Sequence, residues 1–256
     1  EVMMMNFTLS NQVQIPAVGI GTFMMTPDQA EQAVVDALAC GYRMIDTAQA
    51  YMNERAVGRG IKRSGVARED IFISTKIWAS QYLTGTVEKS LELLGTDYID
   101  LMFIHQPAGD FMAGYRKLET VAIRPMVNQI EMHPYFAQES ALKVMEEYQI
   151  VPEAWAPLGG GRHNPFDNEM VKEIAAAHGK TVGQVVLRWN VQRGVVVIPK
   201  SVHKARIEEN FQIWDFTLTE EEMQKISSLD LGYQGTAVKH FDPEFVKMCN
   251  IRKIHE

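Results

Sequence analysis

Strand-like and helix-like segments alternate along almost the whole chain, and this alternation constrains the fold more than any other feature. Apolar runs such as AVGIG (17–21), YRMID (42–46) and IFISTK (71–76) are each followed by a segment whose apolar residues have helical spacing. Repeated strand–helix units predict a parallel sheet whose strands are joined by helices. Because no Pro/Ser-rich or low-complexity stretch divides the chain, we expect residues 1–256 to form one domain.

Turn and cap signals mark the ends of the first elements. FTLSNQVQIP (7–16) has two short alternating runs around Ser10-Asn11, which predicts an N-terminal hairpin. In the helix predicted over 26–41, Thr26 and Gln29 have the spacing of a capping box, and Gly41 follows the last helical residue. Local signals and apolar spacing therefore agree at the start of the chain.

The number of inner strands indicates an incomplete barrel. Seven such strands are predicted, whereas a closed (β/α)8 TIM barrel has eight. Between the helix predicted at 112–119 and the strand predicted at 125–131 only TVAIR remains, which is too short for a strand and its crossover helix. We therefore expect an α/β fold, a (β/α)8 TIM barrel with an N-terminal β-hairpin, from whose sequence the fifth-strand region is absent.

Composition excludes several classes of partner. The net charge is -7, and no Lys/Arg run offsets it, which argues against nucleic acid or an anionic membrane surface. Two distant cysteines, Cys40 and Cys249, are too few for a disulfide framework and favour a reducing, cytoplasmic setting. No apolar run is long enough for a membrane span, no signal peptide is evident, and the histidine and cysteine spacing predicts no metal site.

Four polar residues lie at or just after the ends of successive predicted strands. They are Asp46, Tyr51, Lys76 and His105. In a parallel barrel these ends share one rim, where active sites are built. A buried lysine paired with an aspartate would lower the pKa of a neighbouring phenol, so Tyr51 becomes a candidate proton donor, with His105 hydrogen-bonding the same substrate oxygen.

Each of these residues also has a plain structural interpretation. Asp46 alone could be a turn or cap residue, and Tyr51 alone could be a packing residue. A single histidine after a strand is more often a core residue than a catalyst, and Lys76 alone could form a surface ion pair of little energetic value. Four such residues at one rim favour the catalytic interpretation, because independent accidents would not be expected to face one cavity.

Three long segments resemble the signature segments of the aldo-keto reductases, in the same order. They are GYRMIDTAQAYMNE (41–54), LELLGTDYIDLMFIHQP (91–107) and IPKSVHKARIEEN (198–210), and the similarity extends from about residue 6 to 230. The resemblance implies a barrel enzyme that reduces aldehydes and ketones with NADPH, and it places the catalytic tetrad on the four rim residues. HQPAGD (105–110) and the short loops resemble the branch with 2,5-diketo-gluconate and methylglyoxal reductases and protozoan prostaglandin F synthases.

A local anion site is expected after the last strand. Lys200, Ser201 and Arg206 lie there and at the start of a helix, where backbone N–H groups favour an anion. Two cations and a hydroxyl suit the 2′-phosphate of NADPH, although from the residues alone a basic helix edge in solvent is an equal alternative.

The resemblance implies further contacts to NADPH. Gln129 would contact the nicotinamide amide, Trp155 would stack on the nicotinamide ring, and GGGRHN (159–164) would lie over the pyrophosphate. Glu209 and Asn210 would contact the adenine. The remaining cofactor-binding residues expected from the resemblance are Gly21, Thr22, Asp46 and Leu158.

The expected reaction is hydride transfer to a carbonyl carbon with proton donation by Tyr51. Phe23, Trp78 and His105 would line the substrate pocket, which suits small dicarbonyls, aromatic aldehydes or keto sugars. We expect a monomer. The alternatives are a non-enzymatic NADPH-binding regulatory or structural protein on the same scaffold, and an unrelated phosphate-binding barrel enzyme such as an isomerase.

Two departures from known patterns matter. The family's GVSNF-like segment, whose Ser-Asn pair grips the nicotinamide amide, is missing between Glu119 and Val127, and a shorter piece is missing near 82–86. A true deletion in the protein would expose strand edges and open the barrel at a large cost in stability. We therefore expect that the protein contains residues at these two places that the given sequence leaves out.

Two other motifs are not nucleotide-binding signatures. VGRGIKRSG (57–65) lacks the glycine spacing of a dinucleotide fingerprint, and Gly179-Lys180-Thr181 marks a helix end and not a P-loop.

Overall fold

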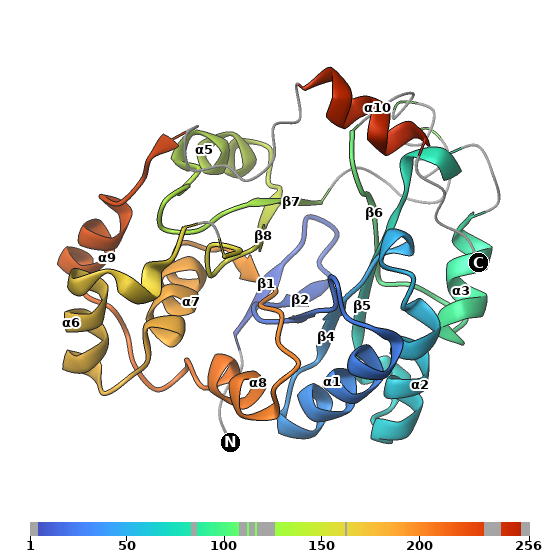
Figure 1. The fold of residues 1–256 in the computed structure, drawn as a ribbon, viewed down its shortest axis with the longest axis horizontal. Coiled ribbons are helices and arrows are strands. Elements are labelled where there is room, and N and C mark those ends of the chain that lie inside the picture. Colours follow the sequence, from blue (N-terminus) through green and yellow to red (C-terminus); the bar gives the residue numbers. More distant parts are fainter. Residues whose placement is uncertain are drawn as a thin grey trace. The chain divides into compact units, whose positions relative to one another are not determined.

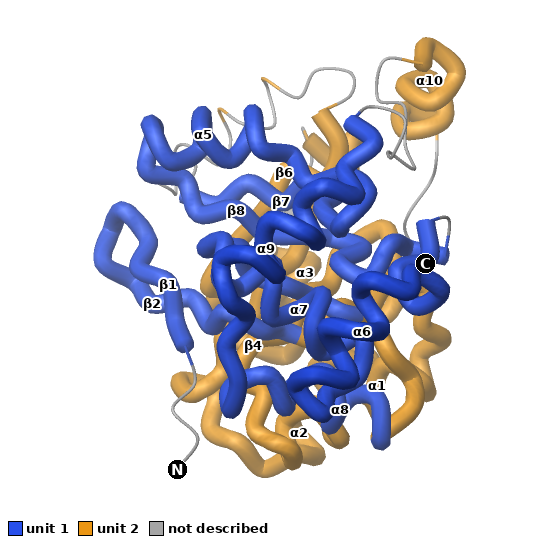
Figure 2. Tube along the Cα trace, turned by 90° about the vertical axis from the view of Figure 1, so that its left-hand side faces the viewer, with its two compact units in different colours: residues 1–19, 125–199, 205–238 blue, residues 20–124, 200–204, 239–256 orange. Residues whose placement is uncertain are grey.

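The computed structural model describes residues 5–82, 86–107, 112, 116, 126–161, 163–232 and 242–251 (Figure 1). The chain forms two compact units, which are coloured separately in Figure 2. The first unit comprises residues 1–19, 125–199 and 205–238, and the second comprises residues 20–124, 200–204 and 239–256. Each unit is described by itself.

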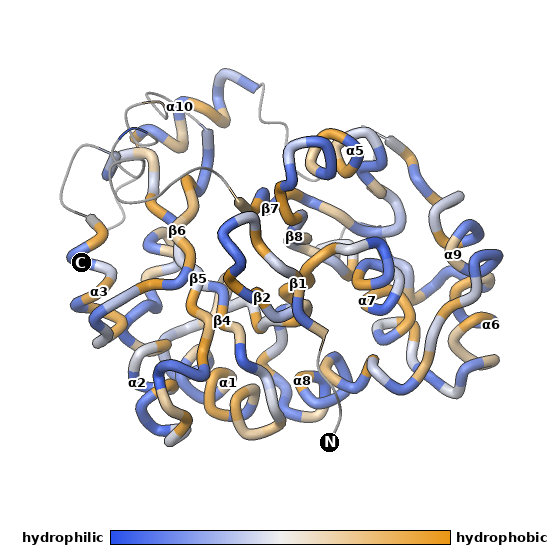
Figure 3. The backbone as a smooth tube through the Cα atoms, turned by 180° about the vertical axis from the view of Figure 1, so that it is seen from behind, coloured by the Kyte–Doolittle hydropathy of each residue, from blue (hydrophilic) through white to orange (hydrophobic). Residues whose placement is uncertain are grey.

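The second unit is built on a four-stranded parallel sheet in the order β3-β4-β5-β6. Its strands are β3 (Ile20–Gly21), β4 (Met44–Asp46), β5 (Phe72–Ile77) and β6 (Leu101–Ile104). Its helices are α1 (Pro27–Cys40), α2 (Glu54–Ser64), α3 (Thr86–Leu94) and α10 (Pro243–Ile251), with 3₁₀ turns η1 (Gln49–Tyr51), η2 (Arg68–Asp70) and η3 (Ala79–Gln81). All six residues of β5 are buried, as expected for a strand covered on both faces, and Figure 3 shows hydrophobic colour along β6.

Helices α1 and α2 lie side by side (Figure 1) because glycines on α2 allow close approach. A Cβ atom on Gly60 would lie 2.8 Å from the Glu31 carbonyl oxygen of α1, and one on Gly58 would lie 2.3 Å from the Leu94 carbonyl oxygen at the end of α3. Gly58 and Gly60 of VGRGIKRSG therefore serve helix packing, and Gly65 ends α2 in a left-handed conformation. The predicted capping box of Thr26 and Gln29 at the start of α1 is confirmed, and Gly41 ends this helix in a left-handed conformation.

The first unit contains the predicted hairpin and a second parallel sheet. Strands β1 (Asn6–Thr8) and β2 (Gln14–Pro16) pair antiparallel, and β7 (Val127–Glu131), β8 (Val151–Trp155) and β9 (Val196–Val197) pair in parallel. Val18 also pairs in parallel with Val197, which covers the outer edge of β9. The helices are α5 (Glu139–Glu147), α6 (Glu169–His178), α7 (Val182–Gln192), α8 (Lys204–Phe211) and α9 (Glu220–Ser227), with 3₁₀ turn η4 (Pro165–Asp167).

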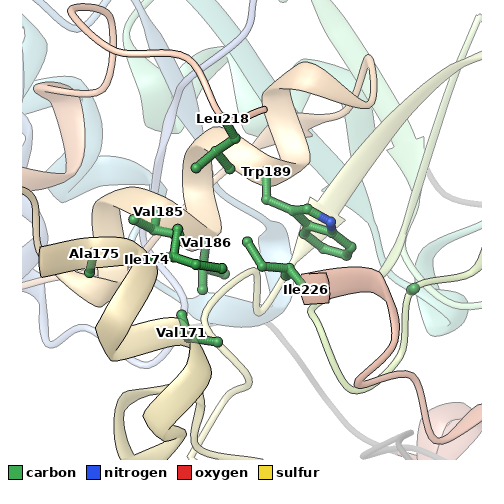
Figure 4. Packing of buried hydrophobic residues seen from close by; sticks show 9 residues of the cluster. Val171, Ile174, Ala175, Val185, Val186, Trp189, Leu218 and Ile226 are labelled. Atoms are coloured by element: carbon green, nitrogen blue, oxygen red, sulfur yellow. The ribbon is translucent and has the colours of Figure 1, made fainter. Parts of the chain in front are cut away.

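An apolar cluster joins three helices of the first unit (Figure 4). Ile174 of α6, Val185 and Trp189 of α7 and Ile226 of α9 are buried against one another. Full burial of such side chains contributes about 1.5–3 kcal/mol each. Gly179 ends α6 in a left-handed conformation and Thr181 caps α7, so this segment is a helix boundary, as the sequence predicts.

Four and three parallel strands among the described residues equal the seven that the sequence predicts. The described strands do not form a closed barrel. The segment TVAIR and most of the helix predicted at 112–119 lie outside the described residues, as do residues 83–85, so the expectations for these places stay predictions. In the described part of the chain, no strand pairs with the outer edge of β6 or of β7. No helix there has both the length and the hydrophobicity that a membrane crossing requires.

Candidate active site

An ion pair is buried at the carboxyl end of the second unit's sheet. Asp46 is 1% exposed and Lys76 is 2% exposed. The Lys76 ammonium donates to the Asp46 carboxylate and to the Thr47 carbonyl oxygen, 2.9 Å away, while the Ser74 hydroxyl donates to Asp46 Oδ2 at 2.8 Å. Asp46 pairs with Ser74 in the sheet, and Ser74 and Lys76 share one face of β5, so strand register and alternation bring these groups together.

Tyr51 and His105 lie beside this ion pair. The Lys76 ammonium is 5.1 Å from the centre of the Tyr51 ring, and the ring centres of Tyr51 and His105 are 5.4 Å apart at an interplanar angle of 80°. Tyr51 ends η1, directly after β4, and His105 directly follows β6. The structure therefore brings together all four rim residues that the sequence singles out.

Two aromatic side chains flank the Tyr51–His105 pair. The Phe23 ring lies 5.1 Å from the Tyr51 ring, and the Trp78 ring lies 5.0 Å from the His105 ring. Phe23 is 54% exposed, whereas Trp78 is buried against Ala50 and Cys249. These rings would give a bound ligand an apolar, aromatic contact on either side of the polar groups.

Asn53 is a functional candidate that sequence reasoning missed. Its buried amide donates to the carbonyl oxygens of Thr22 (3.0 Å) and Met25 (3.2 Å), and its oxygen accepts from the Thr47 hydroxyl at 3.0 Å. It thereby ties the loop that carries Phe23 to the segment after Asp46. Its position two residues after Tyr51, inside the first signature segment, is the signal that could have identified it.

Glu54 is a second buried carboxyl group in this region, 3% exposed, and it too was missed. Burial raises its pKa above the usual value, while hydrogen bonds from the Thr75 and Ser90 side chains and the charge of Lys76 act in the opposite direction. The Thr75 hydroxyl lies 2.7 Å from Glu54 Oε1. The sequence places Glu54 at the start of α2, where an acidic residue is ordinary, so its burial could not be read from the sequence.

Four of the expected cofactor-binding residues lie in the second unit beside Asp46 or just before α8. Gly21 pairs with Asp46 in the sheet, and the Thr22 N–H and hydroxyl both donate to the Asp46 carbonyl oxygen, at 3.0 and 3.2 Å. Ser201 is buried and accepts a hydrogen bond from the His203 N–H at 3.1 Å, and Lys200 is exposed.

In the first unit, Gln129 is the middle residue of β7, and Trp155 is the last residue of β8. The Gln129 amide donates to the Glu153 carboxylate on the neighbouring strand. Leu158, just beyond β8, is partly buried against the apolar cluster of α6 and α7. These expected cofactor contacts are therefore held by the sheet and the helices behind it.

Three expected cofactor residues lie on α8 in the first unit. Arg206 is exposed, whereas Asn210 is buried. Glu209 Oε1 accepts a hydrogen bond from the Thr181 hydroxyl at 2.8 Å. A carboxylate that contacts an adenine would have to share or exchange this bond.

The glycine-rich loop after β8 needs glycine for conformation and for space. Gly159, Gly160 and Gly161 all have positive φ angles, and a Cβ atom on Gly159 would lie 1.8 Å from the His163 carbonyl oxygen. Left-handed backbone of this kind strains other residues. Arg162 lies outside the described residues.

The segment from Lys200 to Arg206 has the chemistry of an anion site. No described carboxylate pairs with Lys200 or Arg206, and the first-turn N–H groups of α8 lack acceptors within the helix. In sequence, two cations and a hydroxyl around the start of α8 are the groups that a phosphate-bearing ligand would require. Among the described residues, no group of three metal-ligating side chains is present.

Residues 17–121 and 112–231 match the sequence model described as the Aldo/keto reductase family. The two matched stretches overlap at residues 112–121. The 9,11-endoperoxide prostaglandin H2 reductase of Trypanosoma cruzi is 42% identical over 257 aligned residues, which cover 87% of this chain and 90% of that protein. The glyoxal reductase of Bacillus subtilis is 41% identical, with 87% of this chain and 91% of that protein covered.

Solved structures agree with these sequence matches. An aldo-keto reductase from a deep-sea metagenome library superposes with a TM-score of 0.88 at 38% identity, covering 92% of this chain and 98% of that chain. An aldo/keto reductase from Brucella melitensis superposes with a TM-score of 0.84 at 37% identity, covering 89% of this chain and 100% of that chain.

Proposed function

This chain belongs to the aldo-keto reductase family, and from that premise we propose that it is an NADPH-dependent reductase of aldehydes and ketones. The family and its reductase-named relatives support carbonyl reduction in general. The observation that carries the finer proposal is a buried Lys76–Asp46 ion pair whose ammonium lies beside the Tyr51 ring, which in turn packs edge-on against His105.

The ion pair would set the protonation chemistry of Tyr51. Two buried charges persist only when they are paired and hydrogen-bonded, and here Ser74 and the Thr47 carbonyl supply the further bonds. An ammonium close to the phenol favours its anionic form, which eases proton release to a substrate. In this mechanism Asp46 holds Lys76, and Lys76 activates Tyr51.

Tyr51 would donate a proton to the carbonyl oxygen of the substrate. His105 would hydrogen-bond the same oxygen and stabilise the negative charge that develops there. Phe23 and Trp78, on either side of this pair, would contact the substrate and keep water from it. The chain's own residues thereby supply the acid, the oxyanion contacts and the apolar wall.

NADPH fits the remaining expected residues. Lys200 and Arg206 have the charge for its 2′-phosphate, and Ser201 has a hydroxyl close by in sequence. Gln129 and Trp155 would contact the nicotinamide. When bound, NADPH would supply the hydride that reduces the carbonyl carbon.

Small dicarbonyls are the first substrates to test. The Bacillus subtilis relative is named a glyoxal reductase, and the aromatic side chains beside Tyr51 also suit aromatic aldehydes. Keto sugars complete the panel. We further propose a cytoplasmic location, because two distant cysteines are too few for a disulfide framework. We also propose a monomer, which gel filtration would test.

The decisive experiment compares wild type with Tyr51→Phe. NADPH consumption is measured with each carbonyl class, with NADH alongside, and NADPH affinity is measured by calorimetry. Loss of the general acid should lower turnover by at least about 10²-fold while leaving NADPH affinity nearly unchanged. Tyr98→Phe is the matched control, because Tyr98 contacts Arg68 away from the site.

Equal turnover in wild type and Tyr51→Phe would overturn the proton-donor assignment. NADPH binding without turnover of any carbonyl would favour the non-enzymatic alternative. Family membership rules out the remaining alternative, an unrelated phosphate-binding barrel enzyme such as an isomerase.

A further inference from the structure

Glu54 lies on the opposite side of β5 from the Asp46–Lys76 pair. Side chains alternate along a strand, so Ser74 and Lys76 share the face that contacts Asp46, whereas Thr75 is on the other face. The Thr75 hydroxyl donates to Glu54, the first residue of α2, at 2.7 Å. Two buried carboxyl groups therefore flank the same strand at the residue pair Thr75-Lys76.

A chain of polar contacts continues from Glu54 to the η1 turn. The buried Ser90 of α3 acts on the Glu54 carboxyl group and lowers its pKa, and the Gln49 amide donates to the Ser90 hydroxyl at 3.2 Å. The Gln49 side-chain oxygen accepts from the Trp78 backbone N–H at 3.0 Å. The donors along this chain point toward Glu54, whose carboxyl oxygens can accept from both hydroxyl groups.

The network connects the two backbone segments whose side chains make up the proposed active site. Gln49 belongs to η1, which ends with Tyr51, and Trp78 and Thr75 flank Lys76 on and beyond β5. Taken with the proposed function, on which this inference rests, the geometry points to Glu54 as a positioning residue. Through Ser90 and Gln49, Glu54 holds the Tyr51 turn at the Lys76 end of β5.

A purely structural role predicts a different response to mutation. Burial of a carboxyl group costs folding free energy, and an apolar side chain of similar size would pack equally well. Positioning requires that the phenol stay close to the ammonium, and a displacement of about 1 Å in an active site can cost 10²-fold in rate. A structural role and a positioning role of Glu54 therefore predict different values of kcat and a different titration of Tyr51 in the variants.

The test uses Glu54→Gln, with Asp100→Asn as the matched control. Asp100 is also a carboxylate bonded to β5, at its opposite end, where it accepts from the Ile73 N–H and from Arg68. Both variants replace a carboxylate by an amide of the same shape. Ser90→Ala is the second variant, because it cuts the link to Gln49 and leaves every charge in place.

Three quantities are measured on each full-length variant: the melting temperature, kcat and KM with the best carbonyl of the panel, and the phenol titration of Tyr51. The titration is followed by NMR of 13C-labelled tyrosine, with the Tyr51 signal identified by its loss in Tyr51→Phe. We expect Glu54→Gln and Ser90→Ala to lower kcat about tenfold to a hundredfold, with little change in KM. The Tyr51 pKa should rise in both, because the phenol moves away from Lys76.

Asp100→Asn should lower the melting temperature and leave kcat and the Tyr51 titration unchanged. The inference is overturned by wild-type kcat and titration in Glu54→Gln or Ser90→Ala, and by equal effects in Asp100→Asn. It is also overturned if the Tyr51 pKa falls in Glu54→Gln, since removal of a negative charge alone has that effect. Failure of the proposed function looks different, because wild type is then inactive while the NMR titration still compares the variants.

Discussion

The two compact units use their polar side chains in opposite ways, although each is built on a parallel sheet. In the second unit, Lys76 contacts both Asp46 and Tyr51, so the proposed catalytic groups contact one another. In the first unit, the expected cofactor contacts Gln129 and Glu209 are hydrogen-bonded to other protein groups, on β8 and at the start of α7.

If the proposed roles hold, this difference separates catalytic groups that are already in place from groups that must rearrange to bind a ligand. The second unit would need no ligand to orient Tyr51, whereas Gln129 and Glu209 would have to exchange existing hydrogen bonds for new ones when a cofactor binds. Exchange of one hydrogen bond for another changes the free energy by about 0.5–1.5 kcal/mol at most. Net affinity for the nucleotide should therefore come mainly from cations such as Lys200 and Arg206, with which no described carboxylate pairs.

The largest expected effect comes from breaking the buried ion pair with Lys76→Met. This change leaves the Asp46 carboxylate buried without its ammonium partner, so the free energy of unfolding should fall by about 3–5 kcal/mol. Turnover should be lost as well. Denaturant unfolding followed by circular dichroism measures the first effect, and NADPH consumption measures the second.

Lys89→Met is the matched control for Lys76→Met. Lys89 and Glu92 form an ion pair at 2.8 Å on the exposed face of α3, in the same unit. Exposed pairs of this kind contribute about 0–1 kcal/mol, so the control should unfold nearly as wild type does. If Lys76→Met were no less stable than Lys89→Met, the pair would not organise the site.

The next largest effect should come from removing the cations near α8. In Lys200→Ala and Arg206→Ala, loss of a charge-assisted phosphate contact of about 1.5–3 kcal/mol should raise KM for NADPH about 10–100-fold. KM for NADH, which has no 2′-phosphate, should change little. Steady-state kinetics with both nucleotides gives the ratio, and Lys172→Ala on the exposed face of α6 is the control. Equal changes for both nucleotides would contradict the assignment.

The sequence predicted the elements well because their signals are local. Capping boxes, helix-ending glycines and apolar spacing act within one turn or strand, so α1 starts and ends where Thr26 and Gly41 predict, and α6 ends at Gly179, in the segment that the sequence marks as a helix end. The four rim residues were also predictable, because strand ends in a parallel sheet share one edge. The sequence pattern was sufficient to predict a residue's location wherever its position along a strand determines its position in the sheet.

The residues that support the site, Asn53 and Glu54, were not predictable, because no local signal determines their burial. Asn53 and Glu54 look like ordinary helix-start residues, and their burial depends on loops and strands distant in sequence, such as the loop at Thr22 and the strand at Thr75. A second limit concerns the eighth strand of a barrel. The spacing of the elements predicts that this strand is lacking between Glu119 and Val127, and residues 117–125 lie outside the described part of the chain, so this stays a prediction.

The smallest effect concerns pH, and here too the two units should differ. Burial raises the pKa of Glu54 above the ordinary value of 4.5. Burial also acts to raise the pKa of Glu222 in the first unit, but bonds from the Thr219 N–H, His178 and the Thr219 hydroxyl lower it below 4.5. The two carboxyl groups should therefore contribute to stability with opposite dependence on pH.

The signs follow from which state holds the proton. Folded Glu54 keeps its proton to higher pH than the unfolded chain does, so its contribution to stability is lost as the pH rises from 4.5 through its folded pKa. Folded Glu222 releases its proton earlier than the unfolded chain, so its contribution is present above 4.5 and lost as the pH falls through its folded pKa.

Glu54→Gln and Glu222→Gln remove these contributions one at a time. Relative to wild type, Glu54→Gln should gain unfolding free energy as the pH is raised above 4.5, whereas the deficit of Glu222→Gln should shrink as the pH is lowered below 4.5. Denaturant unfolding of both variants at a series of pH values on each side of 4.5 measures the two slopes. Slopes of the same sign would mean that the pKa values of the two carboxyl groups shift in the same direction on folding, and the contrast between the units would not extend to Glu54 and Glu222.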